Sequence, residues 1–336
     1  MSSFALGLGI GTRNRKGEWL EVFFPQPRLT PSDALAEVFR GRSPAPLSSG
    51  ELEDIARACD DAGEAAYAKL ARRAAESGRP AVALGLDEDT APDSVPAAYF
   101  KLHLLSHRLV KPHGTDLTGI FGVLPNVAWT DAGAVDLEEL PERQLDARLR
   151  GEVLEVSCVD KFPKMSNYVV PAGVRIAHTA RVRLGAYVGE GTTVMHEGFI
   201  NFNAGSDGPG MIEGRISAGV TVGADSDLGG GCSTMGTLSG GGNMVISVGR
   251  QCLIGANAGL GIPLGDRCTI ESGLYLTAGT KVTMRDAAGR AVETRAARSL
   301  QGMSDLLFRR NSESGAVECL TNKSAVELNA ELHKHN

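Results

Sequence analysis

The feature that most constrains this sequence is a six-residue period of aliphatic side chains in its second half. The period runs through Val170, Ile176, Val182, Val188, Val194, Ile200, Ile216, Val222, Leu228, Val248, Ile254, Leu264, Ile270, Leu276 and Val282. A period of six fits neither an α-helix, whose side chains repeat every 3.6 residues, nor a long strand, whose side chains repeat every two. It is typical of a solenoid in which short strands are joined by tight turns.

A second, mostly smaller residue follows four positions after these aliphatics, and Leu274 is the one bulky exception. Two inward positions in every six residues predict a short strand and a turn, so that three units make a coil of about 18 residues around a narrow core. Cys232, Cys252 and Cys268 are small enough for that core. The composition agrees, because 42 glycines and 5% aromatic residues suit a chain that turns every few residues.

The repeat divides the chain into three predicted parts. Residues 1–165 are expected to form an α/β domain, because apolar runs alternate there with helical patterns such as Ser49–Ser77 and Pro96–Val110. Residues 166–283 are expected to form a parallel β-helix. The period breaks twice, and we predict that loops leave the β-helix at 201–214 and 229–247. Residues 284–336 are predicted to add two strands and a final helix.

The charge of the chain excludes several classes of partner. A net charge of −6 and a pI near 5.7 argue against a nucleic-acid groove or a polybasic membrane surface. No segment approaches the roughly 20 apolar residues of a membrane span, and no basic stretch precedes the apolar residues at the N-terminus. We therefore expect a cytoplasmic protein with small-molecule substrates.

Several common catalytic and metal-binding motifs are missing. The sequence contains no CxxC pair, no GxSxG and no GxxxxGK[ST]. Gly7, Gly9 and Gly11 form GxGxG, which lacks the spacing of a dinucleotide site. His103 and His107 lie four residues apart in a predicted helix, but without an HExxH sequence this pattern favours an ordinary amphipathic helix.

Two other histidines fall on the repeat. His178 and His196 are 18 residues apart, and each follows an aliphatic of the repeat by two positions, so they are predicted to stack on one face. A zinc enzyme such as a γ-class carbonic anhydrase needs three histidine ligands, and the remaining histidines lie off the repeat. His196 as a general base and His196 as a surface imidazole beside Glu197 both stay open.

Glu213 is the candidate carboxylate, because it lies in the first predicted loop beside Gly214 and close to Arg215. In a partly dry, glycine-rich site a glutamate can act as a base or attack a thioester, whereas in water it is an ordinary loop residue. The triplet 229–231 offers backbone N–H groups to an oxyanion, or it consists of turn glycines. The residues alone leave these alternatives open.

Several motifs together resemble a known family. They are VVPAGVRIA, TTVMHEGFINFNAG, MIEGRISAGV, DLGGGCSTMGTLSGGG, GANAGLGIPLGD, ESGLYLTAGTKV and LLFRRNS, all within 166–323, with GIGTRN and WLEVFF nearer the N-terminus. They resemble the actinobacterial and pseudomonad tetrahydrodipicolinate N-succinyltransferases, which are hexapeptide-repeat acyltransferases. The resemblance implies a left-handed β-helix and a homotrimer with sites between chains. It also implies transfer of succinyl from succinyl-CoA to the amino group of L-2-amino-6-oxoheptanedioate, the open-chain form of tetrahydrodipicolinate, in lysine and diaminopimelate biosynthesis.

The resemblance also implies roles for individual residues. Glu213 matches the family's catalytic glutamate, which is described as forming an acyl anhydride. Positions that contact succinyl-CoA in the family are Arg215, Gly230, Ser233, Ala256, Glu271, Ser272, Gly279, Arg309, Arg310, Asn311 and Ser312. Glu197 matches one of two acidic residues that bind magnesium in the family, but the other position is Ala180 here. The alternatives are a hexapeptide-repeat acyltransferase with another acyl-CoA donor or amine acceptor, a carbonic anhydrase, and a scaffold without activity.

Overall fold

The computed structural model describes residues 4–236 and 244–321. The chain divides into two compact units, of which the first comprises Met1–Val110, Gly114–Pro163 and Asn167–Val169 and the second Lys111–His113, Lys164–Ser166 and Val170–Asn336. No helix in the described part of the chain is long and apolar enough to span a membrane.

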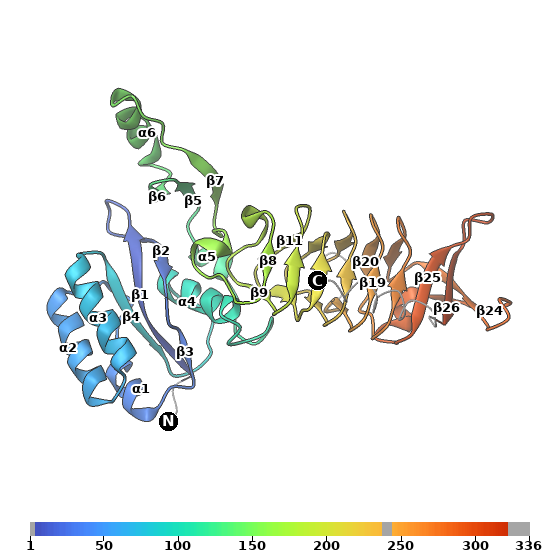
Figure 1. Ribbon diagram of the computed structural model, residues 1–336, viewed down its shortest axis with the longest axis horizontal. Helices are drawn as coiled ribbons and strands as arrows, with labels where there is room; N and C mark the ends of the chain where they lie inside the picture. Colours follow the sequence, from blue (N-terminus) through green and yellow to red (C-terminus); the bar gives the residue numbers. More distant parts are fainter. Residues whose placement is uncertain (1–3, 237–243, 322–336) are drawn as a thin grey trace. The chain divides into compact units, whose positions relative to one another are not determined.

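The first unit contains an α/β layer structure. Its main sheet has the order β2-β1-β3, with β4 also paired to β1, and consists of β1 (Ala5–Arg13), β2 (Trp19–Phe23), β3 (Arg28–Leu29) and β4 (Ala81–Leu86). The helices that cover it are α1 (Asp33–Phe39), α2 (Ser49–Asp61), α3 (Ala65–Ser77) and α4 (Val95–Ser106). Figure 1 shows α1, α2 and α3 on one face of this sheet and α4 on the other.

Successive side chains of β1 point to opposite faces of the sheet, and this explains the GxGxG sequence. Leu6 and Leu8 belong to the core shared with α1, α2 and α3. A Cβ at Gly7 would approach the Phe100 ring to 2.8 Å, and one at Gly9 would approach Val22 to 2.5 Å. These glycines therefore let large side chains pack closely on the second face of the sheet.

Two helix predictions for this unit were wrong in detail. Ser49–Ser77 is two helices, because Gly63 has a φ of +74° between α2 and α3. The N-cap of α2 is Ser48, which forms a capping box with Glu51. The helix predicted from Pro96 is α4, but it is buried on all sides and is not amphipathic.

A smaller sheet completes the first unit. Its order is β6-β5-β7, and its elements are α5 (Ile120–Val123), β5 (Val127–Thr130), β6 (Gly133–Asp136), α6 (Leu140–Leu149) and β7 (Val156–Asp160). The apolar run Ile120–Trp129 therefore splits between a short helix and a strand.

The second unit is a parallel β-helix, in which Figure 1 shows short strands stacked coil upon coil. The longest ladder, which we call ladder A, contains β8 (Arg175–Ile176), β10 (Thr192–Val194), β13 (Gly210–Ile212), β16 (Asp227–Leu228), β19 (Leu253–Ile254) and β21 (Thr269–Ile270). A second ladder contains β11 (Phe199–Ile200), β14 (Arg215–Ile216), β17 (Ser233–Thr234), β20 (Gly259–Gly261) and β22 (Tyr275–Thr277). A third contains β9 (Ala186–Val188), β12 (Ala204–Ser206), β15 (Thr221–Val222) and β18 (Ser247–Val248).

The C-terminal strands extend ladder A. They are β23 (Lys281–Arg285), β24 (Ala291–Ala296), β25 (Leu306–Arg310) and β26 (Val317–Thr321), and β25 pairs with β21 in parallel. Single 3₁₀ turns lie at Met165–Asn167, Thr179–Arg181 and Ala297–Leu300. The strands β25 and β26 are the two that were predicted for the C-terminal element, and β24 is a third that was not predicted. The predicted final helix lies outside the described residues.

The prediction of a loop at 201–214 is wrong. Segment 201–214 contains β12 and β13 and completes a coil, and Ser206 occupies an inward position with only 1% of its surface exposed. The repeat also continues through buried Thr234 of β17. A departure from the coil can therefore begin only after β17, and most of that segment, 237–243, lies outside the described residues.

The repeat also begins later than its first aliphatic residue. Val170 is 70% exposed, although the sequence period placed it inside. Ile176 is half-buried, and the first fully buried member of the period is Val182. At the open end of a stack the first coil has no preceding coil to cover it, so its aliphatics keep part of their surface in water.

Candidate active site

One corner of the β-helix carries most of the predicted site residues. It consists of the residues that directly follow the strands of ladder A, and we call it corner A. Backbone hydrogen bonds connect its successive levels: Glu213 N–H to Leu228 O (2.8 Å), Gly229 N–H to Ile254 O (2.7 Å), Gly255 N–H to Ile270 O (2.8 Å) and Glu271 N–H to Phe308 O (2.9 Å). With about 4.8 Å per coil, the four steps from Glu213 to Arg309 span roughly 19 Å.

The second position of corner A forms a column that is interrupted only at the level of β13. Counted from the inward residue that ends each ladder A strand, this position holds His178, His196, Gly230, Ala256, Ser272 and Arg310. Ala256 and Ser272 are exposed, so this edge is open to a ligand in the single chain. The structure thereby brings predicted donor contacts that are far apart in sequence onto one line.

Corner A is shortened at Glu213. Ile212 and Ile216 are four residues apart, whereas the equivalent pairs in the coils before and after, Val194 with Ile200 and Leu228 with Thr234, are six apart. Arg215 consequently pairs with both Phe199 and Ser233. No residue of this coil occupies the second corner position, which leaves the Glu213 side chain between the levels of His196 and Gly230.

Glu213 is half-buried and lies against the glycine triplet. Its Oε2 atom is 3.5 Å from the position that a Cβ on Gly230 would take. Its backbone carbonyl accepts a hydrogen bond from Gly231 N–H at 3.2 Å. The nearby Cys232 thiol is no rival nucleophile, because burial, with the Glu213 charge adding to it, raises the pKa of Cys232 to about 12.

The three glycines of the triplet differ in what they do. Gly229 N–H donates to Ile254 O and Gly231 N–H to Glu213 O. Within residues 4–236 and 244–321, Gly230 N–H donates to no other group. Gly230 is therefore the member of the triplet that has a backbone donor to offer a ligand.

Arg215, two residues after Glu213, is held in place by Ser233 of the next coil. Its Nε donates to Ser233 Oγ at 3.2 Å and its Nη2 donates at 2.5 Å. Thr234 Oγ1 in turn donates to the backbone carbonyl of Arg215 at 2.9 Å. A guanidinium fixed in this way suits a carboxylate or phosphate.

At the other end of corner A, two neighbouring arginines have separate partners. Arg309 binds the Glu318 carboxylate, whereas Arg310 Nη1 donates to Gly315 O at 3.0 Å. Arg310 N–H donates to Glu271 Oε2 at 2.6 Å. They separate because successive side chains of a strand point to opposite sides.

The structure does not bring every predicted contact to corner A. Gly279 follows β22 of the second ladder and lies at a different corner, with nothing within 4 Å of its missing Cβ. Ser312 lies in the turn between β25 and β26.

The two histidines of the repeat lie one above the other, with their rings edge to face at an interplanar angle of 84°. The rings of His178 and His196 have centroids 5.5 Å apart, as the 18-residue spacing predicts. His196 Nδ1 is 3.2 Å from Glu197 Oε1, and 71% of its side chain is exposed. This environment is that of a surface imidazole.

The surroundings of Glu197 do not fit a magnesium site on this chain. Arg181 lies 3.6 Å from the Glu197 carboxylate, and Ala180 supplies no ligand atom. Within the described ranges, no group of three or more histidine, cysteine, aspartate or glutamate side chains could hold a metal ion. Magnesium prefers several oxygen ligands, and here a cation already faces the one carboxylate.

The histidines of α4 are structural. Burial lowers the pKa of His103 to about 3. Its Nε2 accepts a hydrogen bond from Phe24 N–H at 3.2 Å, and its ring stacks on His107 with centroids 6.0 Å apart. A neutral imidazole of this kind holds β2 against α4.

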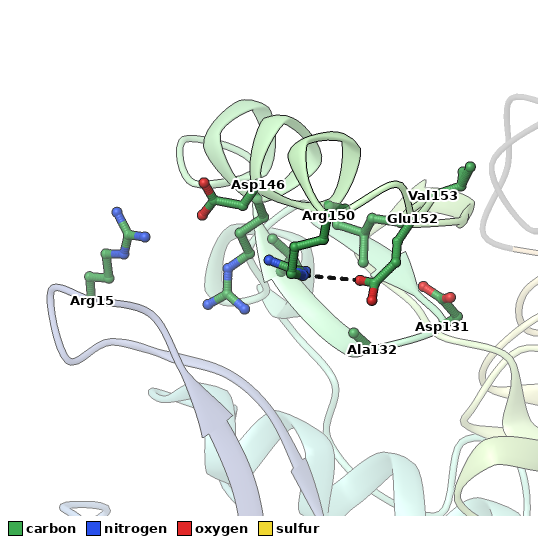
Figure 2. Close-up of a pocket in the computed structure, with 11 residues that line it drawn as sticks. Arg15, Asp131, Ala132, Asp146, Arg150, Glu152 and Val153 are labelled. Atoms are coloured by element: carbon green, nitrogen blue, oxygen red, sulfur yellow. Dashed lines mark hydrogen bonds and ion pairs between the residues drawn. The ribbon is translucent and has the colours of Figure 1, made fainter.

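The first unit has a cavity of about 400 Å³ that sequence reasoning missed, and Figure 2 shows part of its lining. It lies between α6, the strand ends of the small sheet and the turn after β1. Arg150 pairs there with Glu152 at 3.1 Å, and Arg143 pairs with Glu139 at 3.0 Å. Because each of these arginines already has a carboxylate partner, the cavity shows no unbalanced charge that points to a ligand.

Comparison with known proteins agrees with the motif pattern. Residues 124–164 match the family described as "Tetrahydrodipicolinate N-succinyltransferase middle", and residues 245–278 match "Hexapeptide repeat of succinyl-transferase". A 2,3,4,5-tetrahydropyridine-2,6-dicarboxylate N-succinyltransferase of Pseudomonas putida is 64% identical over 340 residues, covering 99% of this chain and 98% of that protein. The chain belongs to the tetrahydrodipicolinate N-succinyltransferase family.

Other members of the family are also similar over their whole length. The Vibrio cholerae enzyme of the same name is 60% identical over 343 residues and is covered completely, as is this chain. A solved structure from Campylobacter jejuni, with the proposed assignment 2,3,4,5-tetrahydropyridine-2-carboxylate N-succinyltransferase, has a TM-score of 0.88 and 32% identity. The match covers 97% of this chain and 94% of the Campylobacter jejuni chain.

Proposed function

We propose that this chain transfers the succinyl group from succinyl-CoA to the amino group of L-2-amino-6-oxoheptanedioate, the open-chain form of tetrahydrodipicolinate. The observation that carries the proposal is full-length identity of 60–64% to enzymes of this name, together with the alignment of the donor-contact positions on one corner. Its place is lysine and diaminopimelate biosynthesis in the cytoplasm.

The donor would lie along corner A. Its thioester would sit at the shortened level, beside Glu213 and Gly230, and its pantetheine arm would pass Ala256 and Ser272. Its phosphates would reach the turn that carries Arg310 and Ser312. The exposed small residues of the column support this path, because they leave room for an extended chain against the backbone.

The chemistry assigned to the shortened level is direct aminolysis. The substrate amine attacks the thioester carbon, Glu213 accepts the proton that the amine loses, and Gly230 N–H donates to the developing oxyanion. The C–S bond then breaks, and the proton held by Glu213 passes to the leaving thiolate, so that CoA leaves as its thiol and Glu213 is a carboxylate again. Arg215 would bind the free carboxylate of the succinyl group.

A second route uses the same residue as a nucleophile. Glu213 would displace CoA to form an anhydride, which the amine would then open. We favour direct attack, because an anhydride is a high-energy intermediate that water destroys. The routes differ in what happens before acceptor is added. Only the anhydride route releases CoA, near one equivalent per site, and leaves an acyl group on the protein that hydroxylamine traps after free succinyl-CoA has been removed.

Purified protein with succinyl-CoA, with and without the acceptor, tests the activity by the appearance of free thiol. We expect CoA release that depends on the acceptor. Parallel reactions with acetyl-CoA, and with other amines, test the alternative of a related acyltransferase. Absence of acceptor-dependent release with succinyl-CoA would contradict the proposed function.

We further propose that the β-helix is left-handed and that three chains assemble with sites between them. Flat faces of a three-sided solenoid can pack around a threefold axis. Sedimentation at micromolar concentration should therefore give the mass of a trimer, and a monomer would contradict this part of the proposal.

A further inference from the structure

Glu318 is a buried carboxylate at the C-terminal end of the β-helix that the proposed chemistry does not use. It lies on β26, opposite Arg309 in the antiparallel pair with β25, and its side chain is completely buried. Buried carboxylates are rare unless they are paired, and this one is paired several times.

Three side chains donate to this carboxylate. Arg285 Nη2 and Asn311 Nδ2 (2.9 Å) reach Oε1, and Arg309 reaches Oε2 through Nε (3.2 Å) and Nη2 (3.1 Å). Burial by itself raises the pKa of Glu318, but the hydrogen bonds from Arg285, Asn311 and Arg309 outweigh it and leave the pKa below its ordinary value. The carboxylate is therefore charged and is the centre of a network.

Through Asn311 the network controls the turn between β25 and β26. Asn311 donates to Glu318 with its amide nitrogen, while its Oδ1 accepts from Glu313 N–H at 3.0 Å and Ser314 N–H at 2.9 Å. Asn311 N–H also bonds Ala316 O at 2.8 Å. One side chain thus transmits the position of Glu318 to the whole turn.

Arg310 is exposed and belongs to the same turn, because its Nη1 donates to Gly315 O. Arg309, by contrast, is ion-paired with the buried Glu318 carboxylate, which it shares with Arg285. The two arginines therefore differ in function: Arg309 serves the network, and Arg310 is the cation available to a phosphate.

We propose that Glu318 is a positioning residue for the nucleotide end of the acyl donor. It holds Arg309 and Asn311, and through them it fixes Arg310 and the turn at the end of corner A. The groups that the positioned turn would bind are the phosphates of CoA. In this respect the inference rests on the proposed function.

The test compares Glu318→Gln with wild type on two donors, succinyl-CoA and succinyl-pantetheine, which lacks the nucleotide. Glutamine has nearly the same shape but removes the charge and turns an N–H₂ group toward the arginines. We expect KM for succinyl-CoA to rise about 10-fold or more. We expect kcat with succinyl-CoA, KM for the acceptor and kcat/KM for succinyl-pantetheine to stay within about twofold.

Two further variants complete the design. Glu318→Asp keeps the charge and should restore part of the donor affinity, while Glu313→Gln, an exposed glutamate in the same turn, should leave KM unchanged. If Glu318→Gln does not fold, Asn311→Ala, which removes one donor and keeps the ion pairs, should give the same selective rise in KM. Equal losses with both donors would overturn the proposal, as would an unchanged KM for succinyl-CoA. Failure of the proposed function would show differently, as a wild-type protein inactive with both donors.

Discussion

Corner A has two stretches with the same backbone ladder and different surfaces. At the levels of β8 and β10 it carries His178 and His196, two exposed rings on coils of regular length. At the levels of β13 and β16 the coil is two residues shorter, and the neighbouring coil supplies three consecutive glycines. Only the second stretch combines a half-buried carboxylate with an uncommitted backbone donor.

The difference shows that the regular repeat of this solenoid fixes where side chains lie. The shortened coil creates the surroundings in which Glu213 can act chemically. A regular corner projects side chains into water, where an imidazole pairs with its neighbour Glu197. The shortened corner draws Glu213 toward the coil axis and places it against backbone.

The largest effect is expected for Glu213→Gln. It keeps the shape of the side chain but can neither accept a proton nor attack a thioester, so kcat should fall about 100-fold or more with little change in KM for succinyl-CoA. His196→Asn, the matched change in the regular stretch, should cost less than about 3-fold. Steady-state kinetics with both substrates measures this. A reversed ranking would assign the base to His196.

The next effect concerns the far end of the same corner. Arg310→Ala removes the exposed cation of the turn, and KM for succinyl-CoA should rise about 10- to 150-fold, the value of one charge-assisted contact. KM for the acceptor should not change. A KM for succinyl-CoA equal to that of wild type would show that the donor does not contact this turn. The donor site along corner A would then extend no further than Ser272.

Buried histidines provide a contrast with the exposed pair of corner A. The folded chain keeps His103 neutral down to about pH 3, whereas an unfolded chain protonates it near pH 6.5. The unfolded state therefore binds more protons below pH 6.5, so stability falls on acidification by about 1.4 kcal/mol per pH unit from this residue. Chemical unfolding of wild type and His103→Gln between pH 7 and 4 measures it. Parallel pH dependences would contradict the assignment.

The smallest effect is expected from the glycines themselves. Gly231 has a φ of +70°, and a Cβ there would lie 2.5 Å from Asn257 Oδ1, so Gly231→Ala should destabilise the fold by about 1–2 kcal/mol. Gly279→Ala is the control, because its φ is not positive and nothing lies near its missing Cβ. Thermal unfolding should separate the two variants, and equal melting temperatures would count against a special corner at Gly231.

Part of this account was predictable from sequence. The aliphatic period predicted a β-helix, because every coil has the same narrow core and needs an apolar side chain of limited size at the same position. It misplaced the first loop and the start of the second, since Ser206 and Thr234 fill inward positions by hydrogen bonding rather than by hydrophobicity. The shortening at Glu213 is visible in sequence only once Ser206 is counted as inward.

Other features depend on contacts that sequence cannot show. LLFRRNS places two arginines side by side, but only the strand pairing shows that Arg309 faces Glu318. The hint was a glutamate between the apolar residues of VECL, which is unusual in a buried strand.

We propose that the acyl donor lies along corner A with its thioester beside Glu213. A crystal structure of the Glu213→Gln variant with succinyl-CoA would show where the donor binds. We expect the thioester carbonyl within hydrogen-bond distance of Gly230 N–H, the pantetheine arm over Ala256 and Ser272, and the phosphates next to Arg310. A donor bound along His178 and His196, or away from corner A, would contradict it.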